Sequence, residues 1–334
     1  MSRPLPPGRP RRPAPNRPRT TDSPARRRSR VALVTLLIAA AAGVPTLPRL
    51  LGPTAPQAAR PPGPEPAVVS PPPAADDALP PATTPPPPPP AVDGAALVAQ
   101  VTTDTPAGGS IAVVVERADG TVLAASPDAD DVRYTASLVK LLVVQQVLHQ
   151  AEAGGLDLTQ PTLDTMARAI SRSDDAAMNR LWDRFGGAAL VRAAAAEFGL
   201  RATAPPAVAG QWGESTTTAA DYATVLVGLP AHLSPRGLTL LTGWMRQASA
   251  TAADGFDQAF GLRSPSVAAA GTVAVKQGWM CCVRSTRQVH STGLLPDGTA
   301  VVLLGRFPVA VDWPTAERAL DETARDVLSA LAHG

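Results

Sequence analysis

Residues 135–151 read TASLVKLLVVQQVLHQA, the most informative stretch for the fold of this chain. Its apolar residues recur with helical periodicity over residues 138–151, and two glycines follow at 154 and 155, so we expect a helix that ends before them. Ser137 precedes the apolar run, which places it at the helix N-terminus. Free backbone N–H groups and the positive end of the helix dipole favour a developing negative charge there. Lys140 follows one turn later on the same face.

Lysine is rare in this chain. Of its 30 lysines and arginines, only Lys140 and Lys276 are lysines. Arginine stays protonated, whereas a lysine that is desolvated or close to another cation can lose its proton and serve as a base. Ser137 could simply be a helix cap and Lys140 a solvated residue, but the leucines and valines around Lys140 argue against solvation.

Further periodic segments lie on both sides of this helix. We expect two strands at 111–116 and 121–125, a block of helices between 163 and 248, and three strands at 273–283, 288–294 and 300–306. A terminal amphipathic helix is expected at 316–332. The helices of the block are expected at 163–170, 175–185, 188–198, 218–229 and 236–248. This order predicts an α+β fold in which both groups of strands join one antiparallel sheet with helices packed against it.

The chain divides into four parts by composition. Residues 1–30 form a basic tail rich in arginine and proline, 31–51 contain an apolar run, 52–92 are mainly proline, alanine and threonine, and 93–334 are expected to form the folded domain. The domain carries 18 basic and 24 acidic residues, a net charge of 18 − 24 = −6. This balance predicts that the domain has no nucleic-acid-binding surface.

The apolar run predicts export. Arginines precede it, which favours an N-terminus in the cytoplasm and a domain outside the cell. Residues 31–51 are long enough for an uncleaved signal anchor in the membrane, which we favour over a cleaved signal peptide that would release a secreted domain. No cysteine lies near the run, which excludes a lipoprotein anchor there.

Two more short motifs complete a set of three. Residues 173–181 read SDDAAMNRL between two expected helices, and residues 276–278 read KQG at an expected strand. Alone, the first of these is explained as a helix cap and the second as an ordinary strand. Together with Ser137 and Lys140, they resemble the three motifs of the serine β-lactamases and penicillin-binding proteins, and residues 173–181 are similar to the class A sequence Ser-Asp-Asn-x-Ala-x-Asn-x-Leu.

The resemblance covers roughly residues 95–334 and implies both a fold and a reaction. The implied fold is an α/β sandwich with a five-stranded antiparallel sheet and a helical subdomain. The implied reaction passes through an acyl-serine intermediate on Ser137, with Lys140 as the base or its modulator and Ser173 as a proton relay. Lys276 would hold Ser173 and a substrate carboxylate, and the backbone N–H groups of Ser137 and Trp279 would form the oxyanion hole.

The sequence departs from that family around the implied substrate site. Asp175, Gln277 and Gly278 are the expected substrate-binding residues, but Asp175 replaces an amide that donates a hydrogen bond. Gln277 replaces a shorter hydroxyl residue and would crowd the site, whereas Gly278 would permit close approach of a ligand backbone. Further candidates are Asn179, which would brace the following loop, and Tyr134 as part of the cleft wall.

The loop at 201–215 lacks the glutamate and asparagine pattern with which class A enzymes activate the deacylating water. Its only acid is Glu214, which is explained equally well as a solvated loop residue. An acyl-enzyme is therefore expected to persist. Trp212 could line the cleft or belong to the core.

Cys281 and Cys282 are the only cysteines, and on a strand they point to opposite faces. The alternatives are a strained disulfide between these neighbours and two reduced, partly buried thiols, and we expect the thiols. No spacing of cysteines and histidines predicts a metal site, and the resemblance implies no cofactor. We therefore expect an exported serine hydrolase acting on β-lactams or on peptidoglycan-like amides and esters. The alternative is a non-catalytic module on the same fold that binds a cell-wall peptide or a partner protein.

Overall fold

The computed structural model describes residues 92–269 and 271–333. The expected basic tail at 1–30, the apolar segment at 31–51 and all but the last residue of the proline-rich segment at 52–92 lie outside the described residues. Within the described part of the chain, none of the helices is both long and apolar enough to span a membrane.

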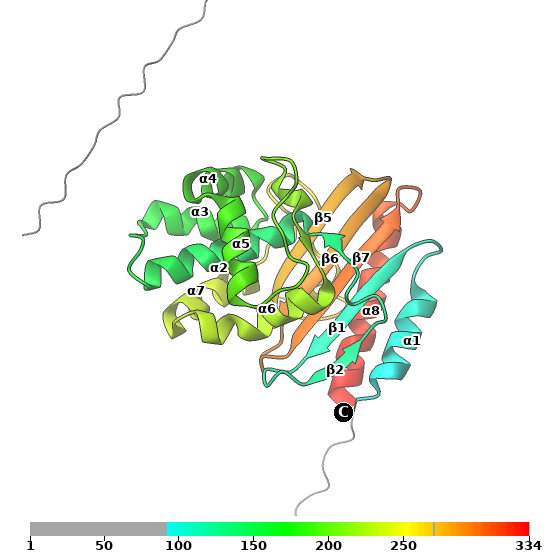
Figure 1. Ribbon diagram of the computed structural model, residues 1–334. Helices are drawn as coiled ribbons and strands as arrows, with labels where there is room; N and C mark the ends of the chain where they lie inside the picture. Colours follow the sequence, from blue (N-terminus) through cyan, green and yellow to red (C-terminus); the bar gives the residue numbers. More distant parts are fainter. Residues whose placement is uncertain (1–91, 270, 334) are drawn as a thin grey trace, which may run out of the picture. The chain divides into compact units, whose positions relative to one another are not determined.

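Five antiparallel strands form the sheet, in the order β2-β1-β7-β6-β5 (Figure 1). The strands are β1 (Ser110–Glu116), β2 (Val122–Ala125), β5 (Ala274–Val283), β6 (Thr286–Leu294) and β7 (Ala300–Pro308). The predicted fold class and the joining of both strand groups in one sheet are confirmed. Because β5 is an edge strand, one side of its backbone has no strand neighbour in this sheet.

Helices cover both faces of the sheet (Figure 1). One side carries the helical block, which comprises α2 (Val139–Glu152), α3 (Gln160–Ser171), α4 (Asp175–Phe185), α5 (Gly187–Glu197), α6 (Ala219–His232) and α7 (Pro235–Arg246). The other side carries α1 (Gly94–Asp104) and α8 (Trp313–His333), which pack on each other and on the sheet. The helices expected from periodicity are all present, with ends shifted by a few residues.

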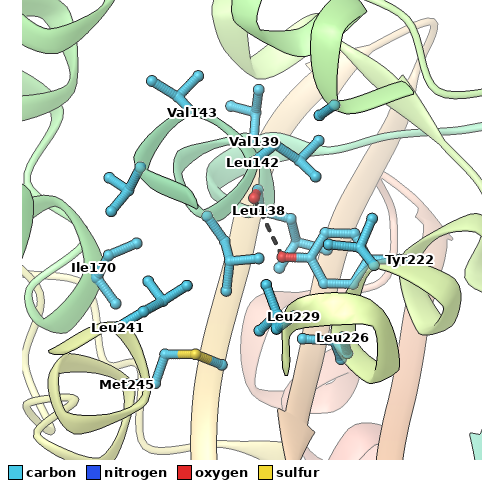
Figure 2. Close-up of a cluster of buried hydrophobic side chains, with 14 of the residues drawn as sticks. Leu138, Val139, Leu142, Val143, Ile170, Tyr222, Leu226, Leu229, Leu241 and Met245 are labelled. Carbon is cyan, nitrogen blue, oxygen red and sulfur yellow. Dashed lines mark hydrogen bonds between the residues drawn. The ribbon is translucent and has the colours of Figure 1, made fainter. Parts of the chain in front are cut away.

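The core has two parts, one on each face of the sheet. Adjacent residues of β7 show the division, because Leu303 packs with the α1 and α8 side and Leu304 packs with the helical block. In the helical block, Tyr222 of α6 is fully buried and its hydroxyl donates to the backbone oxygen of Leu138 at 3.2 Å (Figure 2). This contact ties α6 to the beginning of α2, next to Ser137.

Helix α1 and several short elements have no counterpart in the sequence-based prediction. Helix α1 begins after the capping residue Asp93, whose carboxylate accepts from the Ala96 N–H. The two-residue strands β3 (Arg133–Tyr134) and β4 (Thr216–Thr217) pair with each other. Three 3₁₀ turns also occur, namely η1 (Ala136–Leu138), η2 (Trp212–Glu214) and η3 (Gly261–Arg263). The strands β3 and β4 and the 3₁₀ turns have only two or three residues each. Such elements are too short to show any periodicity, which explains why the sequence did not reveal these five.

Candidate active site

Ser137 and Lys140 are in direct contact at the beginning of the central helix. Ser137 lies in η1, which leads into α2, and Lys140 lies in the first turn of α2. The Lys140 Nζ atom lies 2.8 Å from the Ser137 Oγ atom. The three-residue spacing places both side chains on one face, as the sequence predicts.

Lys140 is buried and paired with an acid. Its side chain is 0% exposed, and its Nζ lies 2.6 Å from Asp175 Oδ1 and 2.6 Å from the backbone oxygen of Ser173. Burial lowers the pKa of Lys140 below its usual value, while the negative charge of Asp175 opposes that decrease. The balance between these two effects decides how readily Lys140 can accept a proton.

Ser173 lies between the two lysines of the chain. Its Oγ is 3.2 Å from Lys140 Nζ and 3.0 Å from Lys276 Nζ. Lys276 also donates to the backbone oxygen of Gln277 at 2.7 Å. Burial and the nearby charge of Lys140 lower the pKa of Lys276 well below its usual value. The structure therefore brings Ser137, Lys140, Ser173 and Lys276 into one connected polar group.

Two residues of this group adopt backbone conformations that are unusual without glycine. Ala136, directly before Ser137, has a φ of 47°, and Ser173 has a φ of 49°. Such left-handed residues persist where surrounding contacts hold them, and they concentrate at functional sites. Asp174, the next residue, caps α4 by accepting from the Ala177 N–H at 2.9 Å, so the second motif also performs the capping that the sequence predicts.

Gly278 makes room for the protein's own chain. A Cβ atom at this position would lie 3.1 Å from the backbone oxygen of Thr135 and 3.2 Å from Leu138 Cγ. The space in the direction of a side chain is taken by the segment that carries Ser137, and the close approach of a ligand backbone to Gly278 stays a prediction. The neighbouring histidine of β6, His290, is fully buried, and burial lowers its pKa to about 4.

Gln277 turns away from Ser137. It is 1% exposed, and its amide nitrogen donates to the backbone oxygen of Phe260. Side chains alternate along β5, so Gln277 lies on the opposite face from Lys276 and Gly278. The expectation that the long glutamine crowds the cleft is wrong for this reason.

Ser137 opens into a cleft of about 360 Å³. Among the residues that line the cleft are Ser137, Asp175, Trp212, Asp254, Trp279 and Met280. Trp212 lies in η2, with its ring centroid 4.8 Å from Lys140 Nζ, and its indole N–H donates to Asn179 Oδ1 at 2.8 Å. Asn179 thus contacts the loop between α5 and α6, and Trp212 covers Lys140 from the cleft side.

Glu214 and Tyr134, the two remaining candidates from the sequence, do not line this cleft. Glu214 is in η2, next to the cleft, but is not among the residues that line it. Tyr134 lines a second cavity, bounded also by Val132 and Arg306, and its backbone oxygen contacts His290 Nε2 at 2.8 Å. Neither Glu214 nor Tyr134 is among the residues that line the cleft at Ser137.

Asp254 is a cleft residue that sequence reasoning missed. It lies in the loop between α7 and η3, where its Oδ1 accepts from the Phe256 N–H at 3.0 Å and its Oδ2 accepts from the Trp279 indole at 3.3 Å. Trp279 stacks on Phe256 with ring centroids 4.7 Å apart. The sequence signal at Asp254 is only that of an ordinary turn, so its position at the cleft comes from the tertiary structure.

Cys281 and Cys282 form a disulfide with each other, which corrects the expectation of two reduced thiols. That expectation assumed that strand side chains alternate between faces. The pairing register of β5 with β6 shifts between Cys281 and Val283, so regular alternation does not hold there. Both cysteines are exposed, and Cys281 lies at the edge of the cleft.

The chain is similar in sequence to curated proteins from mycobacteria. Over 234 residues it is 31% identical to the protein named "Putative lipoprotein LppW" in Mycobacterium bovis and to that in Mycobacterium tuberculosis. The match covers 68% of this chain and 73% of each relative. No protein-family model matches the chain.

Solved structures with a similar fold are β-lactamases. A β-lactamase from Chitinophaga pinensis superposes with a TM-score of 0.59 at 17% identity, covering 71% of this chain and 99% of that one. A β-lactamase from Sphaerobacter thermophilus gives a TM-score of 0.56 at 19% identity, covering 72% of this chain and 98% of that one. At these identities the likeness establishes the fold.

Proposed function

Because the chain belongs to the family of the mycobacterial protein LppW and has the fold of the serine β-lactamase-like superfamily, we propose that it is a serine hydrolase. The proposed reaction proceeds through an acyl-Ser137 intermediate on β-lactams or on peptidoglycan-like amides and esters. The observation that carries this proposal is the 2.8 Å contact between the buried Lys140 Nζ and Ser137 Oγ.

The acylation step follows from this contact. Neutral Lys140 accepts the hydroxyl proton of Ser137, and Ser137 Oγ forms a bond to the substrate carbonyl carbon. The bond from that carbon to the leaving nitrogen or oxygen then breaks, and Ser173 passes a proton from the lysines to the leaving atom. The contacts of Ser173 Oγ with both lysine amines support this relay. The backbone N–H groups of Ser137 and Trp279 are the proposed oxyanion hole.

We propose that the acyl-enzyme is hydrolysed slowly. The only acid of the loop at 201–215, Glu214, is not among the cleft-lining residues, and Trp212 covers the cleft side of Lys140. Both observations argue against a carboxylate that activates water in the place used by class A enzymes.

The proposed location is the cell envelope outside the cytoplasm. The lipoprotein name of the relatives supports export, and residues 31–51 of this chain are the segment proposed to anchor it in the membrane. Cleavage after this segment would release a secreted domain instead.

Covalent labelling tests the acyl-enzyme directly. Intact-protein mass spectrometry after incubation with a fluorescent penicillin or an activated ester is expected to show one adduct on Ser137, which decays slowly. Ser137→Ala is expected to lose the adduct, whereas the control Ser329→Ala, an exposed serine of α8, retains it. Absence of an adduct with every penicillin and ester at high concentration would contradict the proposal, and rapid turnover would contradict slow deacylation alone.

One observation favours a second candidate, a non-catalytic binding module. The 2.6 Å ion pair between Lys140 and Asp175 favours the protonated lysine, which cannot act as a base. In this case the cleft would bind a cell-wall peptide or a partner protein without covalent change. Reversible binding of peptidoglycan fragments, equal in the parent and in Ser137→Ala and without any adduct, would support this candidate over the enzyme.

A further inference from the structure

The ionisable side chains that line the cleft are both carboxylates. Asp175 and Asp254 are the only charged residues among the described residues that line it, and both are exposed. No arginine, lysine or histidine contributes to this lining. The cleft therefore offers an anionic substrate group no cation at its surface.

The two lysines of the chain do not add positive charge to the surface of the cleft. Lys140 is 0% exposed and Lys276 is 1% exposed, and the hydrogen bonds of both amines go to protein atoms. The Lys276 amine is buried and bonded to Ser173 Oγ and to the backbone oxygen of Gln277, so a substrate carboxylate would have to lose its water to reach it. The cost of that desolvation makes a buried amine a poor receptor for an anion.

The two carboxylates differ in whether a cation of the protein already neutralises them. Asp175 is neutralised by its 2.6 Å contact with Lys140. Asp254 has no ion pair among the described residues, and its contacts with the Phe256 N–H and the Trp279 indole hold it in place without neutralising it. Asp254 is therefore the charge that remains for a substrate.

Two aromatic rings line the same cleft as the Asp254 carboxylate. Trp212 and Trp279 both line the cleft, and Trp279 is held by its stacking on Phe256. The faces of indole rings attract cations, and Trp212 already contacts the Lys140 ammonium group in this way. An exposed carboxylate beside a fixed indole ring, in a cleft that a second indole also lines, is a suitable receptor for an ammonium group.

We propose that the cleft selects acyl substrates that carry a primary ammonium group, which Asp254 and the Trp279 indole recognise while Ser137 attacks the carbonyl carbon. This inference rests on the proposed function and specifies its substrate class. It distinguishes an amine-bearing amide or ester from the anionic compounds that the three-motif resemblance alone implies.

Three activated esters of similar length test the charge preference on the full chain. Nitrophenyl esters of aminohexanoic, heptanoic and adipic acids present an ammonium group, a methyl group and a carboxylate, respectively. At low ionic strength, the second-order acylation rate is expected to be roughly tenfold higher for the ammonium ester than for the neutral ester, and lowest for the carboxylate ester. The ammonium preference is expected to decrease as salt is added, because Asp254 is exposed.

A matched pair of variants tests whether Asp254 is the residue that causes the ammonium preference. Asp254→Asn keeps the shape of the side chain and is expected to abolish the ammonium preference, measured within this variant as the ratio of the ammonium-ester rate to the neutral-ester rate. The ratio is the readout because the charge of Asp254 also acts on Lys140 and therefore on both rates. Asp257→Asn removes an exposed acid from the same loop that does not line the cleft, and it is expected to retain the preference.

The outcomes separate the two levels of the proposal. Equal rates for the ammonium and neutral esters, or a faster carboxylate ester, would overturn the charge preference while the acyl-enzyme stands. A preference that Asp254→Asn leaves intact would overturn the role of Asp254. Absence of acylation by all three esters would overturn the hydrolase itself, and the salt dependence of the unmodified protein gives a reading even where a variant fails to fold.

Discussion

At the residue scale, the central feature is Lys140, the proposed base, on whose pKa burial and a neighbouring carboxylate have opposite effects. Lys140 is deeply buried beside Ser137, yet its amine contacts a carboxylate whose side chain is 60% exposed. Burial favours the neutral amine that catalysis needs, and Asp175 favours the protonated one. In the proposed reaction, the acid at position 175 thus sets the pH range in which Lys140 can accept the Ser137 proton.

Replacing this acid is expected to shift the pH dependence of acylation. Asp175→Asn removes the charge that holds up the pKa of Lys140, so that pKa falls and more of the lysine is neutral at a given pH. The rising limb of the acylation rate should move to lower pH, with a several-fold faster reaction near pH 7. Stopped-flow acylation with a neutral ester between pH 5 and pH 10 measures this shift.

The control is Asp183→Asn, which removes an exposed acid from the same helix and should leave the profile unchanged. A loss of rate at every pH in Asp175→Asn would instead indicate that Asp175 takes part in proton transfer itself.

At the scale of elements, the site depends on how closely η1 approaches β5. The glycine at 278 is the point of contact, because a side chain there would meet Thr135 and Leu138 on either side of Ser137. On the other side of η1, the hydroxyl of Tyr222 holds the backbone oxygen of Leu138 (Figure 2). Strand and helix together therefore set the distance between Ser137 and the lysine of β5.

Gly278→Ala is expected to displace η1 and impair acylation more than stability. Overpacking at this contact should cost roughly 1–3 kcal/mol in the free energy of unfolding. Small displacements of a nucleophile can reduce a rate by about 100-fold, so the acylation rate should fall by at least tenfold. Urea unfolding and single-turnover acylation of the same preparation provide both measurements.

Gly243→Ala is the matched control, because nothing lies within 4 Å of the added carbon in α7. This substitution should leave acylation unchanged and, in a helix interior, stabilise by up to about 1 kcal/mol. Normal acylation in Gly278→Ala would show that the close approach is not needed for the reaction.

At the scale of the whole molecule, one sheet joins two cores. The helical block and the pair α1 and α8 pack on opposite faces, so neither core is complete without the strands between them. Leu303 and Leu304 of β7 are both fully buried and belong to different cores. Because the strands are shared, we expect both cores to unfold together.

Leu303→Ala and Leu304→Ala test this expectation. Each should destabilise the protein by about 2–5 kcal/mol, since each leaves a cavity in a packed core. Both should shift one common urea transition, measured by tryptophan fluorescence and by far-UV circular dichroism. Val309→Ala, at a position 44% exposed, should change stability by less than about 0.5 kcal/mol. Two separate transitions, only one of which shifts in each variant, would show that the cores unfold independently.

The sequence alone predicted the order of the five sheet strands and of the helices from α2 onward, the class of fold, and the placement of Ser137 and Lys140 on one face. Periodicity and three-residue spacing are local properties of the chain, which is why these features were predictable. The fold that the three motifs imply is confirmed. Only the tertiary structure decided the rest of the site. Lys276 reaches Ser173 across 103 residues of sequence, and Asp254 reaches the Trp279 indole across 25. The direction of Gln277 and the occupied space beside Gly278 likewise depend on packing against distant segments. No local pattern encodes such contacts, because they exist only once strands and helices from both ends of the domain have packed together.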